Sequence, residues 1–233
     1  MVKLYTKREH LFLRWLIFMI GLVIVSFGIA LMIRADLGSA PWDVLHIGLR
    51  DQLGLTVGTW SIIIGIIVIV MTSLLQKETP QAGGIVNMLL IGVFIDIFLL
   101  LIETPSLLAV QIIMLLAGII IIGYGIGLYI APEVGAGPRD SLMIALHERT
   151  GWKISRVRIM METAVLAVGW VLGGPVFIGT ILFCLGIGQV VGFAMPQTSK
   201  LVHYLIERGG RHENFNKRTL RPYHNDGISK KTR

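Results

Sequence analysis

Six long apolar runs constrain the fold of this chain more than any other feature. They cover residues 11–33, 57–75, 82–102, 107–130, 157–173 and 176–196. An α-helix needs about 20 apolar residues to cross the hydrocarbon core of a bilayer. In lipid each segment must satisfy its own backbone hydrogen bonds, so segments of this length are helices. The runs therefore predict an all-α, polytopic membrane protein with about six transmembrane helices.

Composition and charge agree with this prediction and orient the chain. Only 15% of the 233 residues are charged, whereas soluble domains average about 25%. If the N-terminus lies in the cytoplasm and the chain crosses six times, every Lys and Arg except Arg34 and Arg50 falls inside. Basic residues concentrate on the cytoplasmic side of membrane proteins. Both termini are therefore expected in the cytoplasm.

These boundaries divide the chain into four regions. Residues 1–10 form a cytoplasmic N-terminus, 11–102 a first membrane repeat, 107–196 a second membrane repeat and 197–233 a basic tail. The tail is polar, with scattered Asn, His and Gly, which favours a flexible cytoplasmic segment near anionic headgroups. It has no folded basic face and little aromatic interleaving, so we expect no nucleic-acid partner.

The two membrane regions contain copies of one interrupted segment. "GSAPWD" begins at Gly38 and "GAGPRD" begins at Gly135. In an alignment without gaps, Gly38, Pro41 and Asp43 match Gly135, Pro138 and Asp140. Shared apolar composition would not place Gly, Pro and Asp in register. The two segments therefore indicate an internal duplication.

The orientation of the two copies depends on a short helix that is expected to follow each proline. Pro suits the first turn of a helix, and Asp suits its positive N-terminal end. The first such helix would end near Leu53, which is short and polar for a transmembrane span. We interpret both short helices as re-entrant or interfacial. Each half then crosses three times, and the halves form inverted repeats, as in many transporters.

An alternative topology remains open at this point. If both short helices crossed the membrane, the chain would have eight crossings and the two repeats would be parallel. The charge pattern does not decide between six and eight crossings, because nearly all Lys and Arg residues would lie inside in either topology. Length and polarity favour six crossings.

Nine residues are candidates for binding a solute or an ion. They are Asp96, Asp43, Asp140, Arg34, Trp42, His46, Arg139, Gln189 and Asn87. Asp96 lies in the apolar run "LLIGVFIDIFLLLI", where a carboxylate is costly and usually has a function. It could couple transport to a proton or cation, pair with Arg34, or make a structural hydrogen bond. Gln189 lies in the equivalent region of the second half, and Asn87 could line a cavity or bridge helices.

Asp43 and Asp140 have two alternative roles. They could cap the backbone N–H groups of the short helices, or those helix N-termini could contribute to a ligand site. Trp42 aligns with Arg139, and His46 aligns with Met143. A site built from both segments would therefore be asymmetric.

The residues of the first segment resemble a known family. The matching positions are Gly38, Pro41, Trp42, Asp43, Leu45, Gly58 and Thr59, followed by Gly92 and Asp96. This pattern resembles the YczE/YyaS/YitT group of bacterial integral membrane proteins, over roughly residues 10–197. The resemblance implies a bacterial inner-membrane protein. It leaves the activity open, because the group is largely uncharacterised.

Two functions fit these observations. The first is a small-solute transporter or exporter with alternating access, embedded in the lipid bilayer, for which a homodimer is compatible with so short a chain. The second is a non-transporting membrane factor that binds or regulates a partner protein, with its basic tail as the contact. The sequence contains no metal-binding cluster, phosphate-binding loop or pair of nucleophile and base. We therefore expect neither an enzyme nor a bound cofactor or metal.

Overall fold

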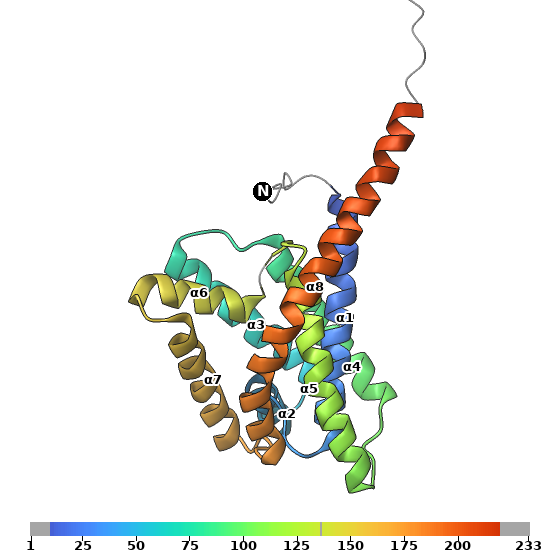
Figure 1. Ribbon diagram of the computed structural model, residues 1–233. Coiled ribbons are helices and arrows are strands. Elements are labelled where there is room, and N and C mark those ends of the chain that lie inside the picture. The colour runs from blue at the N-terminus through green and yellow to red at the C-terminus, as the bar shows by residue number, and fades with distance from the viewer. Residues whose placement is uncertain (1–9, 136, 220–233) are drawn as a thin grey trace, which may run out of the picture.

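The computed structural model describes residues 10–135 and 137–219, and this part of the chain is all-helical, as predicted (Figure 1). The helices are α1 (Leu11–Ala35), α2 (Pro41–Leu53), α3 (Val57–Gln76), α4 (Ala82–Leu101), α5 (Leu108–Ile130), α6 (Pro138–Thr150), α7 (Ile154–Val171) and α8 (Ile178–Thr219). No strand occurs among the described residues. Each predicted apolar run overlaps one of the six longer helices.

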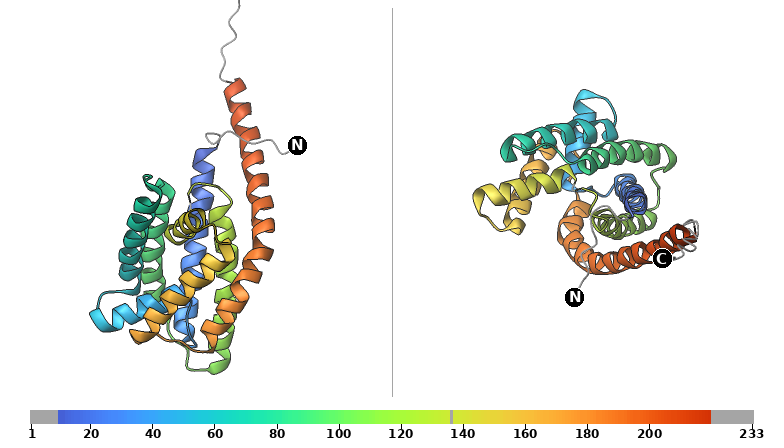
Figure 2. Two further views of the ribbon diagram at one scale, coloured as in Figure 1. Left: turned by 90° about the vertical axis from the view of Figure 1, so that its left-hand side faces the viewer. Right: turned by 90° about the horizontal axis from the view of Figure 1, so that it is seen from above.

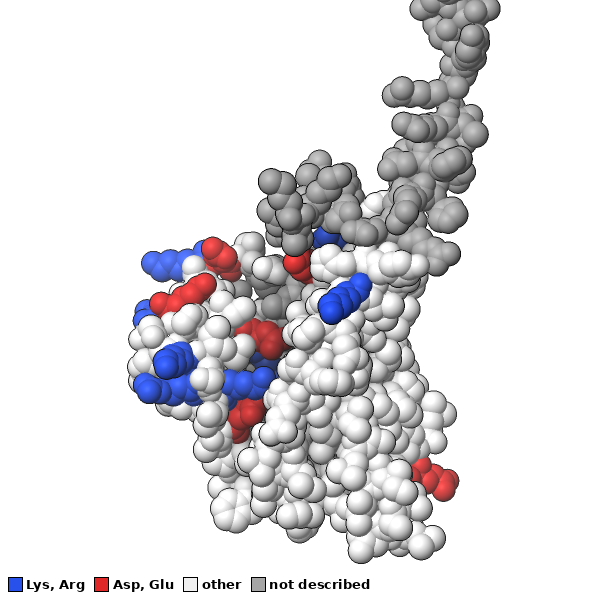
Figure 3. All heavy atoms as spheres, viewed as in Figure 1, with Lys and Arg blue, Asp and Glu red and all other residues white. Residues whose placement is uncertain are grey.

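Five of the described helices are long and apolar enough to cross a bilayer: α1, α3, α4, α5 and residues 178–206 of α8. Much of their surface is apolar and exposed, and Figure 3 shows charged side chains gathered mainly over α6 and α7. The chain is therefore a multi-pass membrane protein. The remaining predicted span is α7, which has 18 residues and carries Arg156, Arg158 and Glu162. It is not among the five.

Proline and glycine mark the boundaries of the two short helices. Pro41 and Pro138 occupy the first turns of α2 and α6, where the missing N–H group costs nothing. Gly54 and Gly151 end these helices with φ angles of 74° and 69°, a conformation that glycine adopts without steric cost. The first short helix therefore ends at Leu53, as the sequence indicated, and both helices begin at the predicted proline.

Helix α1 lies at the centre of the bundle and runs antiparallel to α5. Seen from above, α4, α1, α5 and α8 follow one another as layers (Figure 2). Four glycines allow α1 and α5 to approach closely: Gly21 lies against Tyr129, Gly28 against Ile122, Gly118 against Met32 and Gly125 against Val25. A Cβ atom at Gly28 would lie only 2.8 Å from the Ile122 side chain. The backbones of α1 and α5 therefore pack closely against each other in the core.

The two short helices lie towards opposite ends of the bundle. Helix α2 lies towards the end at which α1 finishes, and α6 lies towards the end at which α1 begins (Figure 1). Helix α2 packs against α7 and α3, and α6 packs against α3 and α7. At the α2–α7 contact, Gly169 lies against the backbone of Leu45, and Gly48 lies against the carbonyl oxygen of Gly169.

Helix α8 is longer than its predicted span and extends out of the bundle (Figure 1). The sequence predicted a flexible tail from residue 197, but the helix continues through Pro196 to Thr219. Buried side chains recur every four residues along this extension: Ala194, Thr198, Val202 and Ile206. Val202 and Ile206 pack against Ile17 of α1. This packing explains the longer helix. Residues 220–233 of the predicted tail and residues 1–9 lie outside the described part.

Candidate functional site

A cavity of about 170 Å³ lies between the two halves of the chain. Every one of the eight described helices contributes to its lining. Ile29, Val68, Met88, Ile122 and Phe183 are among its apolar residues. An apolar cavity of about 150 Å³ can hold a molecule of benzene. The cavity is therefore large enough for a small solute.

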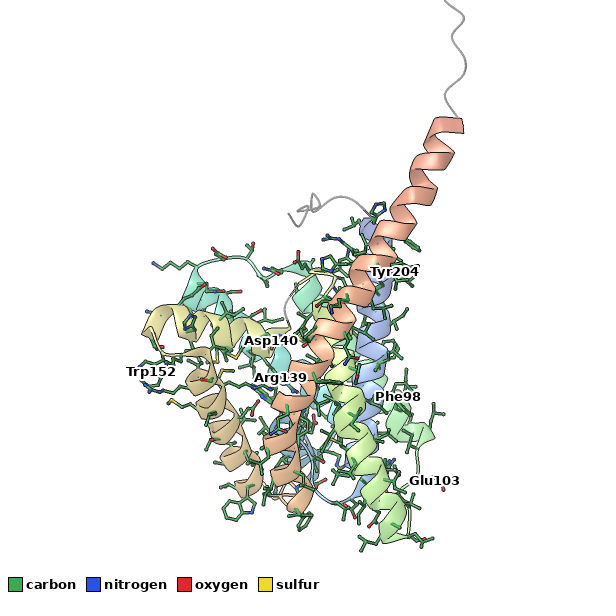
Figure 4. All side chains as sticks on the ribbon, viewed as in Figure 1. Phe98, Glu103, Arg139, Asp140, Trp152 and Tyr204 are labelled. Atoms are coloured by element: carbon green, nitrogen blue, oxygen red, sulfur yellow. The ribbon has the colours of Figure 1, made fainter. Side chains whose placement is uncertain are left out.

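The N-termini of α2 and α6 meet at this cavity. Pro41 and Pro138 both line it. The guanidinium carbon of Arg139 lies 4.7 Å from the centroid of the Trp42 ring, which is a cation–π contact. Figure 4 shows Arg139 and Asp140 at the start of α6, in the middle of the molecule. Trp42 and Arg139, which occupy equivalent positions in the repeat alignment, are thus in direct contact.

Asp43 and His46 are the most unusual side chains of the cavity. Each is only 1% exposed. Neither carboxylate oxygen of Asp43 and neither ring nitrogen of His46 has a hydrogen-bond partner in the described part of the chain. The nearest approach between them is 3.8 Å, from His46 Nδ1 to Asp43 Oδ1. Buried polar groups without a partner are costly. Because these atoms have no partner within the described part of the chain, they are available to bind a ligand.

The protein environment changes the protonation of both groups. Burial raises the pKa of the Asp43 carboxyl to about 6, and the positive charge of Arg139 limits this rise. Burial lowers the pKa of His46 well below its usual range, and Arg139 lowers it further. His46 is therefore neutral near pH 7. Asp43 changes its charge close to neutral pH.

Asp140, Arg158 and Glu162, which also line the cavity, already have hydrogen-bond partners. Tyr129 donates a hydrogen bond from its hydroxyl to Asp140 Oδ2 at 3.1 Å. Arg158 Nε donates to Glu162 Oε1 at 2.9 Å, the i,i+4 pair expected from their spacing. These pairs leave Asp43 as the carboxylate in the described cavity without a hydrogen bond.

The structure brings six of the nine candidate residues together. Asp43, Asp140, Trp42, His46, Arg139 and Asn87 all line the cavity. Asn87 contributes an amide nitrogen that has no partner among the described residues. Tyr129, Ser61, Arg158 and Glu162 also line it. Sequence reasoning did not place these four at a site, because only the packing of α3, α5 and α7 against the short helices brings them there.

The other three candidates lie away from the cavity. Asp96 accepts hydrogen bonds from the Gly58 backbone N–H at 2.8 Å and from the Thr56 hydroxyl at 2.5 Å. Arg34 donates to the backbone carbonyl of Leu99 and makes no ion pair with Asp96. Gln189 is exposed on α8. Asp96 thus ties α4 to the N-terminus of α3.

Comparison with known proteins gives a family and several relatives. A family model described as a family of unknown function, DUF6198, matches residues 12–196. The chain is 43% identical over 202 residues to the uncharacterised membrane protein YczE of Bacillus subtilis strain 168, over 86% of this chain and 94% of that protein. It is 30% identical over 198 residues to the uncharacterised protein YyaS of the same organism, over 83% of this chain and 96% of YyaS.

A third relative comes from a different organism. It is an uncharacterised protein of Haemophilus influenzae, strain ATCC 51907, with 34% identity over 192 residues, 82% of this chain and 88% of the relative. No solved structure matches this chain. The resemblance to YczE and YyaS that the motif indicated is thereby confirmed. The matched region includes every residue that lines the cavity.

Proposed function

The chain belongs to the family of unknown function DUF6198, and on that premise we propose that it transports a small solute across the bacterial cell membrane. One observation carries the proposal. A buried carboxylate without a hydrogen-bond partner, Asp43, faces a cavity enclosed by all eight helices. Ionisable groups inside membrane proteins commonly mark substrate or ion pathways.

The contacts between α1 and α5 support two inverted repeats. Gly28 contacts Ile122 while Gly125 contacts Val25, and Gly21 contacts Tyr129 while Gly118 contacts Met32. In the repeat alignment, Gly28 is equivalent to Gly125 and Val25 is equivalent to Ile122. Likewise, Gly21 is equivalent to Gly118 and Met32 is equivalent to Tyr129. This exchange is the contact pattern of two halves related by a twofold axis. Trp42 and Arg139 are themselves equivalent, and their contact supports a cavity on that axis.

The same arrangement supports six crossings. In this topology α7 is the fifth transmembrane helix in chain order, with Arg156 and Arg158 at its cytoplasmic end, from which long basic side chains can reach the interface. Helices α2 and α6 have 13 residues each and enter from opposite sides without crossing. Paired broken or re-entrant helices that meet near the bilayer midplane form the substrate sites of many transporters.

This geometry supports a mechanism of alternating access. The Trp42–Arg139 contact joins the tips of α2 and α6 across the axis. Rocking of one half against the other would open the cavity first to one side of the membrane and then to the other. Asp43 and His46 would bind the solute, and Asp96 would hold α3 against α4.

A ligand screen on the purified full-length protein tests this function. Thermal unfolding is measured with a broad set of metabolites and ions, on the wild type, on Asp43→Asn and on Asp51→Asn. Asp51 is an exposed residue of the same helix, paired with Arg50, and serves as the matched control. A ligand present at 100 times its Kd stabilises a protein by about 2.7 kcal/mol. We expect a ligand that stabilises the wild type and the control but not Asp43→Asn.

A ligand that stabilises all three proteins equally would place the binding site elsewhere. The absence of any stabilising ligand would contradict a solute site in the cavity. It would favour the alternative of a membrane factor that binds a protein partner.

A further inference from the structure

The cavity contains two opposite charges that the protein leaves unsatisfied. Asp43 has no hydrogen-bond partner among the described residues. The Arg139 guanidinium likewise makes no hydrogen bond and no ion pair within 4.0 Å in the described part of the chain. The two groups affect each other's charge state, but they do not pair directly. A site with two separated, unsatisfied charges of opposite sign is complementary to a dipolar ligand.

The contact with Trp42 determines which part of Arg139 a ligand can reach. The guanidinium lies over the face of the indole ring. A guanidinium that rests on an aromatic face keeps its N–H donors along its edge. Those donors form a planar fork that matches the two oxygens of a carboxylate. Trp42 thus holds Arg139 in position and leaves the N–H donors of Arg139 available for a ligand.

Asp43 and His46 supply the complementary end of the site. An ammonium group has three donors and a positive charge, which fit a carboxylate and a neutral imidazole nitrogen. Asp43 belongs to α2 and Arg139 belongs to α6, so a ligand that contacts both connects the two halves of the chain. In the repeat alignment, Asp140 is equivalent to Asp43 and Trp42 is equivalent to Arg139. These two residues do not form a second site of this kind, because Asp140 already accepts a hydrogen bond from Tyr129.

The remaining lining limits the size of the ligand. The cavity volume is about 170 Å³. Three methionines, Met88, Met143 and Met161, face it together with branched aliphatic residues. Methionine side chains adapt to different apolar shapes, so the cavity would accept small apolar substituents of varied form.

We propose that the transported solute is a small zwitterion of the amino-acid class, with its carboxylate on Arg139 and its ammonium group on Asp43. This inference rests on the proposed transport function and names its substrate class. A ligand with only one charge would leave either the buried Asp43 or the half-buried Arg139 without a hydrogen-bond partner. Such an unpaired charge is strongly unfavourable.

The test compares amino acids with analogues that lack one charge. The full-length protein in lipid nanodiscs is titrated with each of the common amino acids. L-valine is compared with 3-methylbutanoate and isobutylamine, and L-alanine with propionate and ethylamine. Hydrogen bonds to charged groups contribute about 1.5–3 kcal/mol, or roughly 10- to 100-fold in affinity. We expect amino acids to bind more tightly than both analogues by that factor.

Two variants assign each end of the ligand to its residue. Asp43→Asn should abolish the preference for the amino acid over the carboxylate analogue. Arg139→Gln should abolish the preference over the amine. Exposed residues of the same helices provide the controls Asp51→Asn and Arg149→Gln, which should behave as the wild type. If Arg139→Gln does not fold, Arg139→Lys keeps the charge and removes the fork, and should weaken binding of the amino acid.

The outcomes separate this inference from the proposed function. If an amine binds the wild type as tightly as the matching amino acid and depends on Asp43, the solute is a cation, and only the zwitterion inference is wrong. If neither these compounds nor any member of the metabolite screen binds, both are wrong.

Discussion

Three aspartates in the described part of the chain lie in apolar surroundings, and their partners distinguish their roles. Asp96 accepts two hydrogen bonds from the start of α3, and Asp140 accepts one from Tyr129. Asp43 accepts none. A protein that retains a buried, unpaired carboxylate gives up stability, and such positions are usually functional. At the residue scale, Asp43 is therefore the best candidate for ligand binding.

Substitution of Asp43 and of Asp96 should have opposite effects. Asp43→Asn removes an unpaired buried charge, so the free energy of unfolding should stay constant or rise while ligand binding is lost. Asp96→Asn removes charge-assisted hydrogen bonds, so the free energy of unfolding should fall by about 1.5–3 kcal/mol, with binding retained. Thermal unfolding and ligand titration of both variants check this. Loss of binding in a fully stable Asp96→Asn would instead assign Asp96 to the site.

Ligand affinity should depend on pH through Asp43. Protonation removes the charge that a cationic group requires, and burial raises the pKa of this carboxyl to about 6. The groups around it are His46 on α2, Tyr129 on α5, Arg139 and Asp140 on α6, and Arg158 and Glu162 on α7. His46 remains neutral, because burial lowers its pKa. Affinity should therefore fall as the pH drops below about 6.

Titration of the Kd against pH measures this dependence. The Asp43→Asn variant lacks the ionisable carboxyl group. The Kd of any residual binding should therefore no longer change with pH near 6. An affinity that increases on acidification would contradict the role of the ionised carboxylate.

The motif residues of the site could be predicted from the sequence, whereas the role of Asp96 could not. Asp43, His46 and Arg139 follow the repeated glycine and proline, which mark local backbone structure. Asp96 attracted attention because a carboxylate is costly in an apolar helix. Its partner is the start of α3, 38 residues away in sequence, and that pairing depends on how α3 packs against α4.

At the scale of the helices, glycine determines which pairs approach closely. Gly58 of α3 lies so close to Gly92 of α4 that a Cβ atom there would overlap the Gly92 carbonyl oxygen. The same residue donates its N–H to Asp96. The α3–α4 pair therefore depends on the absence of a side chain at this position.

Alanine substitutions at two glycines should have effects of opposite sign. Gly58→Ala should lower the free energy of unfolding by about 1–3 kcal/mol, because the added methyl group forces the helices apart. Gly188→Ala in α8 is the control, since nothing lies within 4 Å of its Cβ position. Alanine favours a helix by up to about 1 kcal/mol over glycine. A destabilisation of equal size at both positions would show that packing is not the cause.

The helix boundaries followed from apolar runs and from proline and glycine, but the extension of α8 did not. Its buried positions, such as Val202 and Ile206, are separated by exposed residues that include both polar and apolar side chains. Composition alone made this segment resemble a flexible tail. The contact with Ile17 of α1 that stabilises it is visible only in the tertiary structure.

At the scale of the whole molecule, six crossings and eight crossings place two loops on opposite sides. With six, the loop before α4 lies inside and the loop after α4 lies outside. With eight, both positions are reversed. The exposed cysteine of the chain, Cys184, is first replaced by alanine. Thr79→Cys and Ser106→Cys are then labelled separately in intact spheroplasts with a membrane-impermeant maleimide.

Six crossings predict labelling at residue 106 and not at residue 79. Labelling after lysis shows that both cysteines are reactive. The reverse pattern in intact spheroplasts would establish eight crossings and parallel repeats.

Solute exchange in proteoliposomes tests the central claim most directly. Vesicles that contain the purified protein are loaded with unlabelled ligand from the binding screen and then exposed to a radiolabelled trace of it. The proposed function predicts accumulation of the label with the wild type and with Asp51→Asn, and none with Asp43→Asn or with protein-free vesicles. Tight, Asp43-dependent binding without any flux would contradict transport and would identify the protein as a membrane-embedded receptor for the same solute.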